Sequence, residues 1–598
     1  MLNRSTLVSR SAAVIFIFLA GVQGTAALAQ GPAEDTLKQI IEEGNPAYLD
    51  WSTALADREQ IGRLYAANGY RLLWSDGEKP STAALVLLQE LRHASERGLD
   101  PEDYPGNRLA YLLIDLIDSA HPGVEQWALF DASLSWAALR FLSDLHYGRI
   151  EPASVGHNLT IERIRLDIPT TLANLATAVN VRVAIDALEP QFTHYALLKR
   201  ELARYRQLAA EEGLNDLPPL PARSLKTGDI YAGTSRLARL LTALGDMRGG
   251  QTPGGEPQGS SKPGGEPEGS SQPGDPPPVE PSADAQPLTP PLVDAIKHFQ
   301  YRHGEKPDGI LGAATLAELA KPLSLRARQI ELTMERWRWL PSELVSAPII
   351  VNIPQFRLFA FESTADSEAH IRQMDVIVGK AFEATQTPVF TADMSYLIFR
   401  PYWEVPYSIA LKEIVPAARR NPSYIDKHQM EIVRGGGDSA SILPTTAENV
   451  ELVAKGALRV RQKPGPNNSL GLVKFMFPNP YNVYLHSSPA GGLFAESRRD
   501  FSHGCVRVSD PVGLAQYVLR DSPEWTREKI LAAMNGTSTL TVTLKNRIRI
   551  FIAYGTALVT EKGDALFFDD IYGHDQRLEA ALNSRRPRAA PGAPAAVP

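Results

Sequence analysis

Apolar residues recur at two different spacings along this chain of 598 residues. From about residue 34 to residue 225 they follow the three- and four-residue spacing of amphipathic helices, for example at Ala84, Leu87, Leu88 and Leu91. This region contains no cluster of titratable residues with a recognisable site spacing. We therefore expect a helical N-terminal part that acts as a scaffold.

From about residue 348 the apolar residues gather instead in short runs bounded by Pro and Gly, which is typical of strands. The runs cover residues 349–353, 356–361, 374–378, 483–485, 506–508, 540–544 and 548–553. Helical material is expected between about 407 and 460, and short helices around 292–299 and 315–319. The predicted fold class is multidomain α+β, with a β-rich C-terminal domain that carries a helical insertion.

The stretch from Gly249 to Glu280 has a different composition: 17 of its 32 residues are Gly or Pro, and a ten-residue unit repeats in it. Such a segment cannot bury enough apolar surface to offset the entropy of ordering it. It is predicted to be a flexible linker or loop.

Charge and cysteine content exclude several classes of protein. The net charge of −7 argues against a dedicated nucleic-acid binder, which usually has a basic excess. The single cysteine, Cys505, excludes an intramolecular disulfide and a Cys-rich zinc site.

The first residues have the layout of a secretory signal peptide. Arg4 and Arg10 precede an apolar run that ends near Ala27-Leu28-Ala29. Cleavage after Ala29 is expected. The alternative is a retained membrane anchor, which is disfavoured because the run falls short of the ~20 residues that a spanning helix needs. The chain is predicted to be exported.

The chemistry-bearing residues lie around the lone thiol. A cysteine needs a nearby base or positive charge to become a nucleophilic thiolate at neutral pH. His486 ends a strand-like run and His503 lies two residues before Cys505, while Gly504 allows close backbone approach. The N–H groups of Gly504 and Cys505 are candidates for binding an oxyanion. The pattern predicts acyl transfer through a thioester.

The motif Ser502-His503-Gly504-Cys505-Val506-Arg507, with His486 nineteen residues before the thiol, resembles the signature of the L,D-transpeptidases of the YkuD family. Further stretches resemble its large periplasmic YcbB-type branch: 400–406, 464–467, 471–479, 484–486 and 570–573. Residues 225–322 resemble a peptidoglycan-binding domain. That likeness makes the Gly/Pro-rich segment an insertion inside one domain rather than a boundary.

The resemblance implies a role for each matching residue. Cys505 is the expected nucleophile and His486 the general base, oriented by the carbonyl of Ser487. The oxyanion-hole candidates are the N–H groups of Gly504 and Cys505 and the hydroxyl of Tyr484. His503 is expected to support the motif rather than act as the base. The remaining candidates contact substrate: Arg507 as a partner for a carboxylate or for the thiolate, and Trp403 and Tyr402 as cleft-lining residues, with core packing as their alternative.

The implied reaction is attack on the third residue of a peptidoglycan tetrapeptide stem, loss of D-Ala, and a 3→3 cross-link. Alternatives that use the same thioester are an L,D-carboxypeptidase and a lipoprotein-to-peptidoglycan transferase. A non-catalytic wall-binding protein is the alternative from another class. A papain-like hydrolase fits less well, because its histidine follows its cysteine.

The family further implies stem peptides, tetrapeptide-supplying cell-wall enzymes and carbapenem-type inhibitors as partners, and a periplasmic location. Neither a cofactor nor a metal is predicted. The expected domains are a signal peptide (1–29), a helical scaffold (34–224), a peptidoglycan-binding domain (225–322) with a disordered insertion (249–288), a catalytic domain (346–555) with a cap (about 407–460), a helical or turn segment (556–583) and a disordered tail (584–598).

Overall fold

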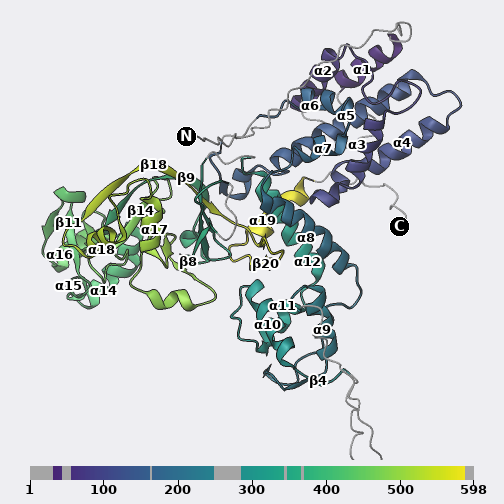
Figure 1. Ribbon diagram of the computed structural model, residues 1–598. Helices are drawn as coiled ribbons and strands as arrows, with labels where there is room; N and C mark the ends of the chain where they lie inside the picture. Colours follow the sequence, from purple (N-terminus) through teal and green to yellow (C-terminus); the bar gives the residue numbers. More distant parts are fainter. Residues whose placement is uncertain are drawn as a thin grey trace, which may run out of the picture.

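The computed structural model describes residues 31–43, 55–161, 165–247, 284–341, 346–364 and 370–585. The predicted signal peptide, residues 249–283 of the predicted insertion and the tail after residue 585 lie outside these ranges. Three lobes meet around the helices α8 (Thr193–Ala209) and α12 (Leu323–Arg338) (Figure 1). None of the helices in the described part is both long and apolar enough to span a bilayer.

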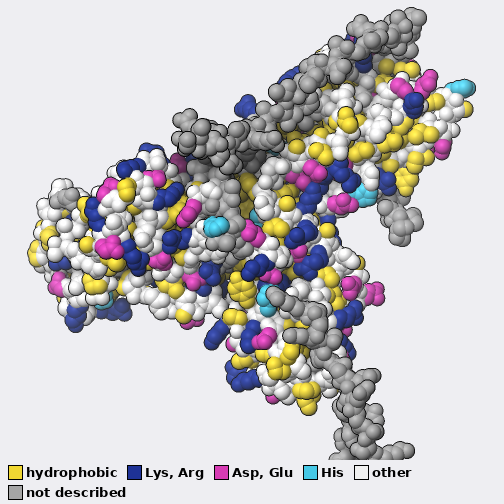
Figure 2. Space-filling model, viewed as in Figure 1, with side chains coloured by type: hydrophobic (Ala, Val, Ile, Leu, Met, Phe, Trp, Pro, Cys, Tyr) yellow, Lys and Arg dark blue, Asp and Glu magenta, His cyan; other side chains and the backbone are white. Residues whose placement is uncertain are grey.

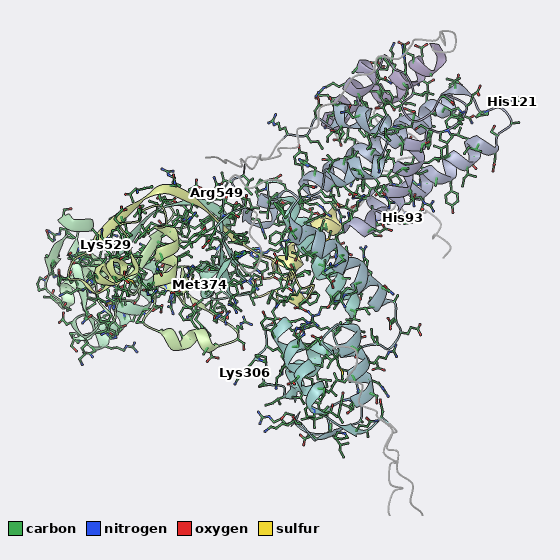
Figure 3. All side chains as sticks on the ribbon, in the orientation of Figure 1. His93, His121, Lys306, Met374, Lys529 and Arg549 are labelled. Atoms are coloured by element: carbon green, nitrogen blue, oxygen red, sulfur yellow. The ribbon has the colours of Figure 1, made fainter. Side chains whose placement is uncertain are left out.

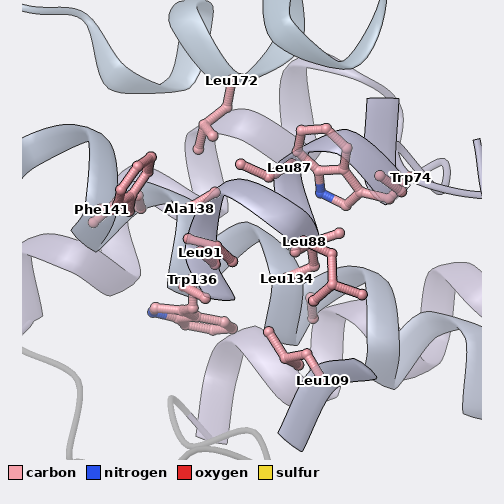
Figure 4. Packing of buried hydrophobic residues seen from close by; sticks show 14 of the residues in the cluster. Trp74, Leu87, Leu88, Leu91, Leu109, Leu134, Trp136, Ala138, Phe141 and Leu172 are labelled. Carbon is pink, nitrogen blue, oxygen red and sulfur yellow. The ribbon is translucent and has the colours of Figure 1, made fainter. Parts of the chain in front are cut away.

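The N-terminal lobe is helical, as predicted. Its elements are α1 (Gly31–Glu43), α2 (Leu55–Ala67), α3 (Thr82–Arg92), η1 (Ala94–Arg97), η2 (Pro101–Asp103), α4 (Gly106–Asp118), α5 (Val124–Tyr147), η3 (Pro152–Val155), α6 (Ile168–Ala176) and α7 (Val181–Asp186). Helix α5 runs through the centre and is buried on most sides, because its apolar residues contact several neighbouring helices (Figure 4). Trp74, Leu87, Leu134 and Phe141 are among the fully buried side chains there.

The middle lobe contains three helices and four two-residue strands. They are β2 (Ser224–Leu225), β3 (Ile230–Tyr231), α9 (Thr234–Ala243), β4 (Gln286–Pro287), α10 (Pro290–Arg302), β5 (Leu311–Gly312) and α11 (Ala313–Leu319). The predicted insertion reaches residue 288, whereas the structure has β4 paired with β3. Leu288 is buried in the lobe's core and Thr234 Oγ1 donates to Gln286 O at 2.7 Å, so these last residues belong to the folded lobe.

The C-terminal lobe is built on one large sheet in the order β1-β9-β14-β15-β17-β8-β7-β6-β18. Strand β18 also pairs with β9, so the sheet closes on itself around an apolar core. The strands are β1 (His157–Asn158), β6 (Ile349–Asn352), β7 (Arg357–Ala360), β8 (Arg372–Gly379), β9 (Val389–Phe399), β14 (Val473–Met476), β15 (Leu485–His486), β16 (Asp500–Ser502), β17 (Val506–Val508) and β18 (Leu540–Ala553). Helices η5 (Glu383–Thr385), η8 (Gly491–Ala495), α17 (Pro511–Val518) and α18 (Arg527–Asn535) connect them.

The insertion between β9 and β14 is not purely helical, which corrects the prediction. Its strands form a separate sheet in the order β10-β13-β11-β12. Met430, Ile432 and Val460 belong to an apolar core of its own. Its elements are β10 (Trp403–Glu404), α13 (Tyr407–Ile409), the π-helix η6 (Ala410–Ile414), α14 (Val415–Arg420), α15 (Tyr424–Lys427), β11 (Met430–Arg434), η7 (Gly437–Ser439), β12 (Ser441–Leu443), α16 (Ala447–Ala454) and β13 (Arg459–Gln462).

The C-terminal segment returns to the centre of the molecule. Its hairpin of β19 (Ala557–Val559) and β20 (Ala565–Phe567) corrects the expected helical or turn segment, and α19 (His574–Ser584) follows. The tail was expected to be disordered from residue 584, but Arg585 pairs with Asp144 at 2.7 Å. The segment therefore ties the C-terminus to the N-terminal lobe.

The N-terminal and C-terminal lobes are also joined directly. Strand β1 pairs in parallel with β9 of the large sheet, and Arg549 on β18 donates to Thr160 O at 3.3 Å (Figure 3). On the face seen in Figure 2, basic and acidic side chains are interspersed, in keeping with the small net charge.

Candidate active site

Three neighbouring strands place the predicted residues on one face of the large sheet. Strand β15 lies between β14 and β17, and His486 is in register with Lys474 on one side and Arg507 on the other. Side chains alternate along a strand, and Leu485 and Val506 point into the core. His486, Arg507 and Lys474 therefore lie on the opposite face.

The same alternation adds two more residues to this face. Cys505 is two residues before Arg507, and Tyr484 is two residues before His486. The Tyr484 and His486 rings are 5.8 Å apart between centroids. The thiol, the phenol and the imidazole that the sequence singled out thus come together.

His486 is held as a neutral base. Its ring is buried, and Nδ1 lies 2.6 Å from the carbonyl oxygen of Ser487. Because a carbonyl only accepts, Nδ1 carries the proton and Nε2 is the basic nitrogen. Burial, with Arg507 and Lys474 nearby, lowers the pKa of His486 to about 3. The Ser487 carbonyl, predicted to orient this ring, thus lies within hydrogen-bond distance of it.

Ser487 is itself fixed by the neighbouring strand. Its N–H donates to Val473 O at 3.0 Å, and its Oγ accepts from Leu472 N at 2.7 Å. A Cβ at Gly471 would fall 1.9 Å from Ser487 Oγ, so only glycine fits there. The carbonyl that orients His486 is therefore part of a rigid packing arrangement.

Cys505 is half-buried in the turn between β16 and β17. Burial raises the pKa of its thiol, while hydrogen bonds from the Tyr484 backbone and hydroxyl and the charges of Lys474 and Arg507 act in the opposite direction. The raised pKa and the neutral His486 together mean that the resting pair is a thiol and an imidazole at neutral pH.

We predict that alkylation of Cys505 by iodoacetamide accelerates with pH and is still accelerating above pH ~8.5, the ordinary pKa of a free thiol. The reason is that the pKa of the thiol is raised and that of His486 is lowered, so no thiolate–imidazolium pair is present at acid pH. The measurement is the alkylation rate between pH 5 and 10, with Cys505→Ala as the control. A rate that is flat from pH 5 to 8 would show a pre-formed ion pair instead.

Lys474 is a site residue that sequence reasoning missed. Its Nζ lies 3.7 Å from the centroid of the Tyr484 ring, and it is in register with His486. Burial lowers its pKa, although Cys505 and Glu404 act against this. Only the strand register brings Lys474 to the site, and no local motif indicates it.

The turn around Cys505 differs from the prediction in the bonding of one backbone N–H group. The N–H of Gly504, expected in the oxyanion hole, instead donates to Ser502 Oγ at 3.1 Å, and Ser502 Oγ donates to Cys505 O at 2.5 Å. Among the described residues, no acceptor is found for the N–H of Cys505. The oxyanion donors that remain are this N–H and the Tyr484 hydroxyl.

His503 points away from the catalytic pair. Its Nε2 lies 2.7 Å from Glu413 Oε1, on the π-helix η6 of the insertion. His503 thus joins the insertion to the nucleophile turn, which sequence reasoning did not foresee. It supports the turn and is not placed as a base.

Core packing, the alternative that the sequence left open, is found for Trp403, whereas Tyr402 contacts an arginine. Trp403 packs against the insertion's core, and the Tyr402 ring lies 4.2 Å from the guanidinium carbon of Arg461. These contacts do not test the expectation that the two residues line a cleft.

Arg507 is the candidate for binding an anionic group. Its Nε is buried and has no hydrogen-bond partner within the described chain. Burial lowers the pKa of Arg507, and Cys505 acts in the opposite direction. Within the described residues no group of three or more His, Cys, Asp or Glu side chains is arranged to hold a metal ion.

Comparison with known proteins agrees with this geometry. Residues 59–202 match the family model of a scaffold domain, and residues 347–539 match that of the L,D-transpeptidase catalytic domain, YkuD. A Haemophilus influenzae protein described as "Putative L,D-transpeptidase" is 30% identical over 257 residues, 42% of this chain and 49% of that protein. The chain thus spans about half the length of this curated relative. Residues 347–539, which contain Cys505 and His486, are thus similar to the L,D-transpeptidase catalytic domain, YkuD.

Proposed function

We propose that this protein is a periplasmic L,D-transpeptidase that forms 3→3 peptidoglycan cross-links through an acyl-enzyme on Cys505. The observation that carries the proposal is the arrangement of His486. Its Nδ1 is bonded to Ser487 O at 2.6 Å, and its ring shares a sheet face with the thiol. A fixed tautomer beside a thiol is what nucleophilic catalysis requires.

In the acylation step, Cys505 Sγ attacks the carbonyl of the third stem residue, a diaminopimelate. Its proton moves to His486 Nε2 and then to the departing amine of D-Ala, as the C–N bond breaks and the S–C bond forms. The Cys505 N–H and the Tyr484 hydroxyl stabilise the oxyanion. Arg507, with its unpartnered Nε, binds a carboxylate of the stem.

In the second step, a side-chain amine of a neighbouring stem attacks the thioester. The C–N bond forms as the C–S bond breaks, the proton of the amine passes to His486 Nε2, and His486 returns it to Cys505 Sγ, which leaves as the thiol. The His503–Glu413 contact joins the insertion to the nucleophile turn.

The remaining assignments belong to the same proposal. Residues 225–322 would bind peptidoglycan, the N-terminal leader would direct export, and other cell-wall enzymes would supply tetrapeptide stems. Carbapenem-type compounds would acylate Cys505, because a strained β-lactam is attacked by the same thiol.

The test is incubation of the protein with disaccharide-tetrapeptide, beside Cys505→Ala, followed by mass spectrometry of the products. A dimer that lacks one D-Ala, absent with the variant, is expected. Tripeptide without dimer would instead show a carboxypeptidase, and dimer formation by Cys505→Ala would contradict the proposal.

A further inference from the structure

The peptide group between Gly504 and Cys505 accepts a hydrogen bond from a threonine that lies outside the sequence motif around Cys505. Thr387 Oγ1 donates to Gly504 O at 2.8 Å and accepts from Gly379 N at 2.9 Å. Thr387 is fully buried. Gly504 has a φ of 120°, which favours glycine, so the turn depends on its surroundings to keep this shape.

Thr387 is in turn fixed by the C-terminal segment. The hydroxyl of Tyr572 donates to Gly379 O and accepts from Thr387 N at 3.3 Å. The Tyr572 N–H donates to Tyr554 Oη at 3.0 Å, and that hydroxyl donates to Asp570 Oδ1 at 2.7 Å. The stretch 570–573, for which the reaction itself provides no role, is thus connected to the nucleophile turn.

A peptide group is planar, with its C=O and the following N–H on opposite sides. A hydrogen bond that fixes the Gly504 carbonyl therefore also fixes the direction of the Cys505 N–H. This N–H is the backbone donor that remains for the oxyanion, since the Gly504 N–H is bonded to Ser502 Oγ.

We propose that Thr387, held in place by Tyr572, is a positioning residue that aims the Cys505 N–H at the oxyanion. The proposal deepens the proposed function and rests on its acyl-transfer chemistry. Tyr572 lies outside residues 347–539, so the working site includes a residue beyond the matched catalytic domain.

The test compares two reactions of Cys505 in the full chain. p-Nitrophenyl acetate acylates the thiol: the S–C bond forms, p-nitrophenolate leaves, the proton goes to His486, and an oxyanion develops on the way. Iodoacetamide alkylates the thiol by displacing iodide, and no oxyanion forms. Loss of a well-aimed oxyanion donor costs on the order of 10²-fold or more, so misdirection of this N–H should slow acylation alone.

For Thr387→Val we expect acylation by the ester to slow roughly 10- to 100-fold, with iodoacetamide alkylation within about twofold of wild type. Thr387→Ser keeps the hydroxyl and should restore acylation. The matched control is Thr391→Val, which removes a buried hydroxyl. This hydroxyl donates to Thr160 O at 3.1 Å rather than to a residue of the Cys505 turn. Tyr572→Phe should show a weaker effect in the same direction.

Ester acylation by Thr387→Val at the wild-type rate would overturn the proposal. So would an equal loss of both reactions in a variant that melts like wild type, because the hydroxyl would then act on the thiol itself. If wild type reacts with the ester but makes neither cross-linked nor trimmed product from stems, the proposed function fails. The Thr387 comparison still decides the positioning role in that case.

Discussion

Replacing His486 with Ala is expected to lower acyl transfer by about 10³-fold or more, because the variant loses the base that takes the thiol proton and returns it to the leaving amine. The readout is the single-turnover release of D-Ala from tetrapeptide. His503→Ala should cost far less, about tenfold at most, since its ring is bonded to Glu413 rather than placed at the thiol.

The matched control is His93→Ala, which changes an exposed ring on the N-terminal lobe whose Nδ1 contacts Gln89 O (Figure 3). It should react like wild type. An His486→Ala protein with more than a tenth of wild-type activity, or an His503→Ala protein with none, would reverse the assignment of the base.

The second large effect is on stability. Asp246 accepts from Arg302 through both oxygens and from His298 Nδ1, and the side chains of Asp246 and Arg302 are almost fully buried. Asp246→Ala leaves the guanidinium buried without its counter-charge. Removing one partner of a buried pair costs about 3–5 kcal/mol, so the middle lobe should melt roughly 10 °C or more below wild type.

Arg302 Nη1 also donates to Ala565 O at 2.6 Å, on the C-terminal hairpin. Asp246→Ala should therefore also weaken the contact between the middle lobe and the C-terminal hairpin. Differential scanning calorimetry measures the shift. Asp294→Ala is the control, because Asp294 pairs with Lys297 at the surface and its side chain is 72% exposed. A shift no larger than that of the control would show that the buried pair contributes little.

Local patterns were enough to predict much of this protein. The spacing of Leu87, Leu88 and Leu91 indicated helices, and the apolar runs indicated β6, β7, β8, β15, β17 and β18, but not β1, β9, β14 or β16. Cys505 and His486 were proposed as site residues from their motif, and the structure places Cys505 directly before β17 and His486 at the end of the neighbouring strand β15. The Ser487 carbonyl followed from its place next to His486.

Residues brought in by register or by distant loops could not be predicted in this way. Lys474 reaches the site through strand pairing, Thr387 through a loop 117 residues from Gly504, and Glu413 from an insertion 90 residues from His503. The strands of the insertion were missed because they are only two to five residues long and are interspersed with helices. The bonding of the Gly504 N–H depends on a turn geometry that its sequence does not specify.

The proposed reaction passes through an acyl-enzyme on Cys505. The most direct measurement is the intact mass of the protein during its reaction with disaccharide-tetrapeptide, followed by peptide mapping. We expect an adduct equal to the substrate less D-Ala, located on Cys505 and cleared when an acceptor amine is added. Product formation with no adduct on Cys505, or with the adduct on another residue, would contradict it.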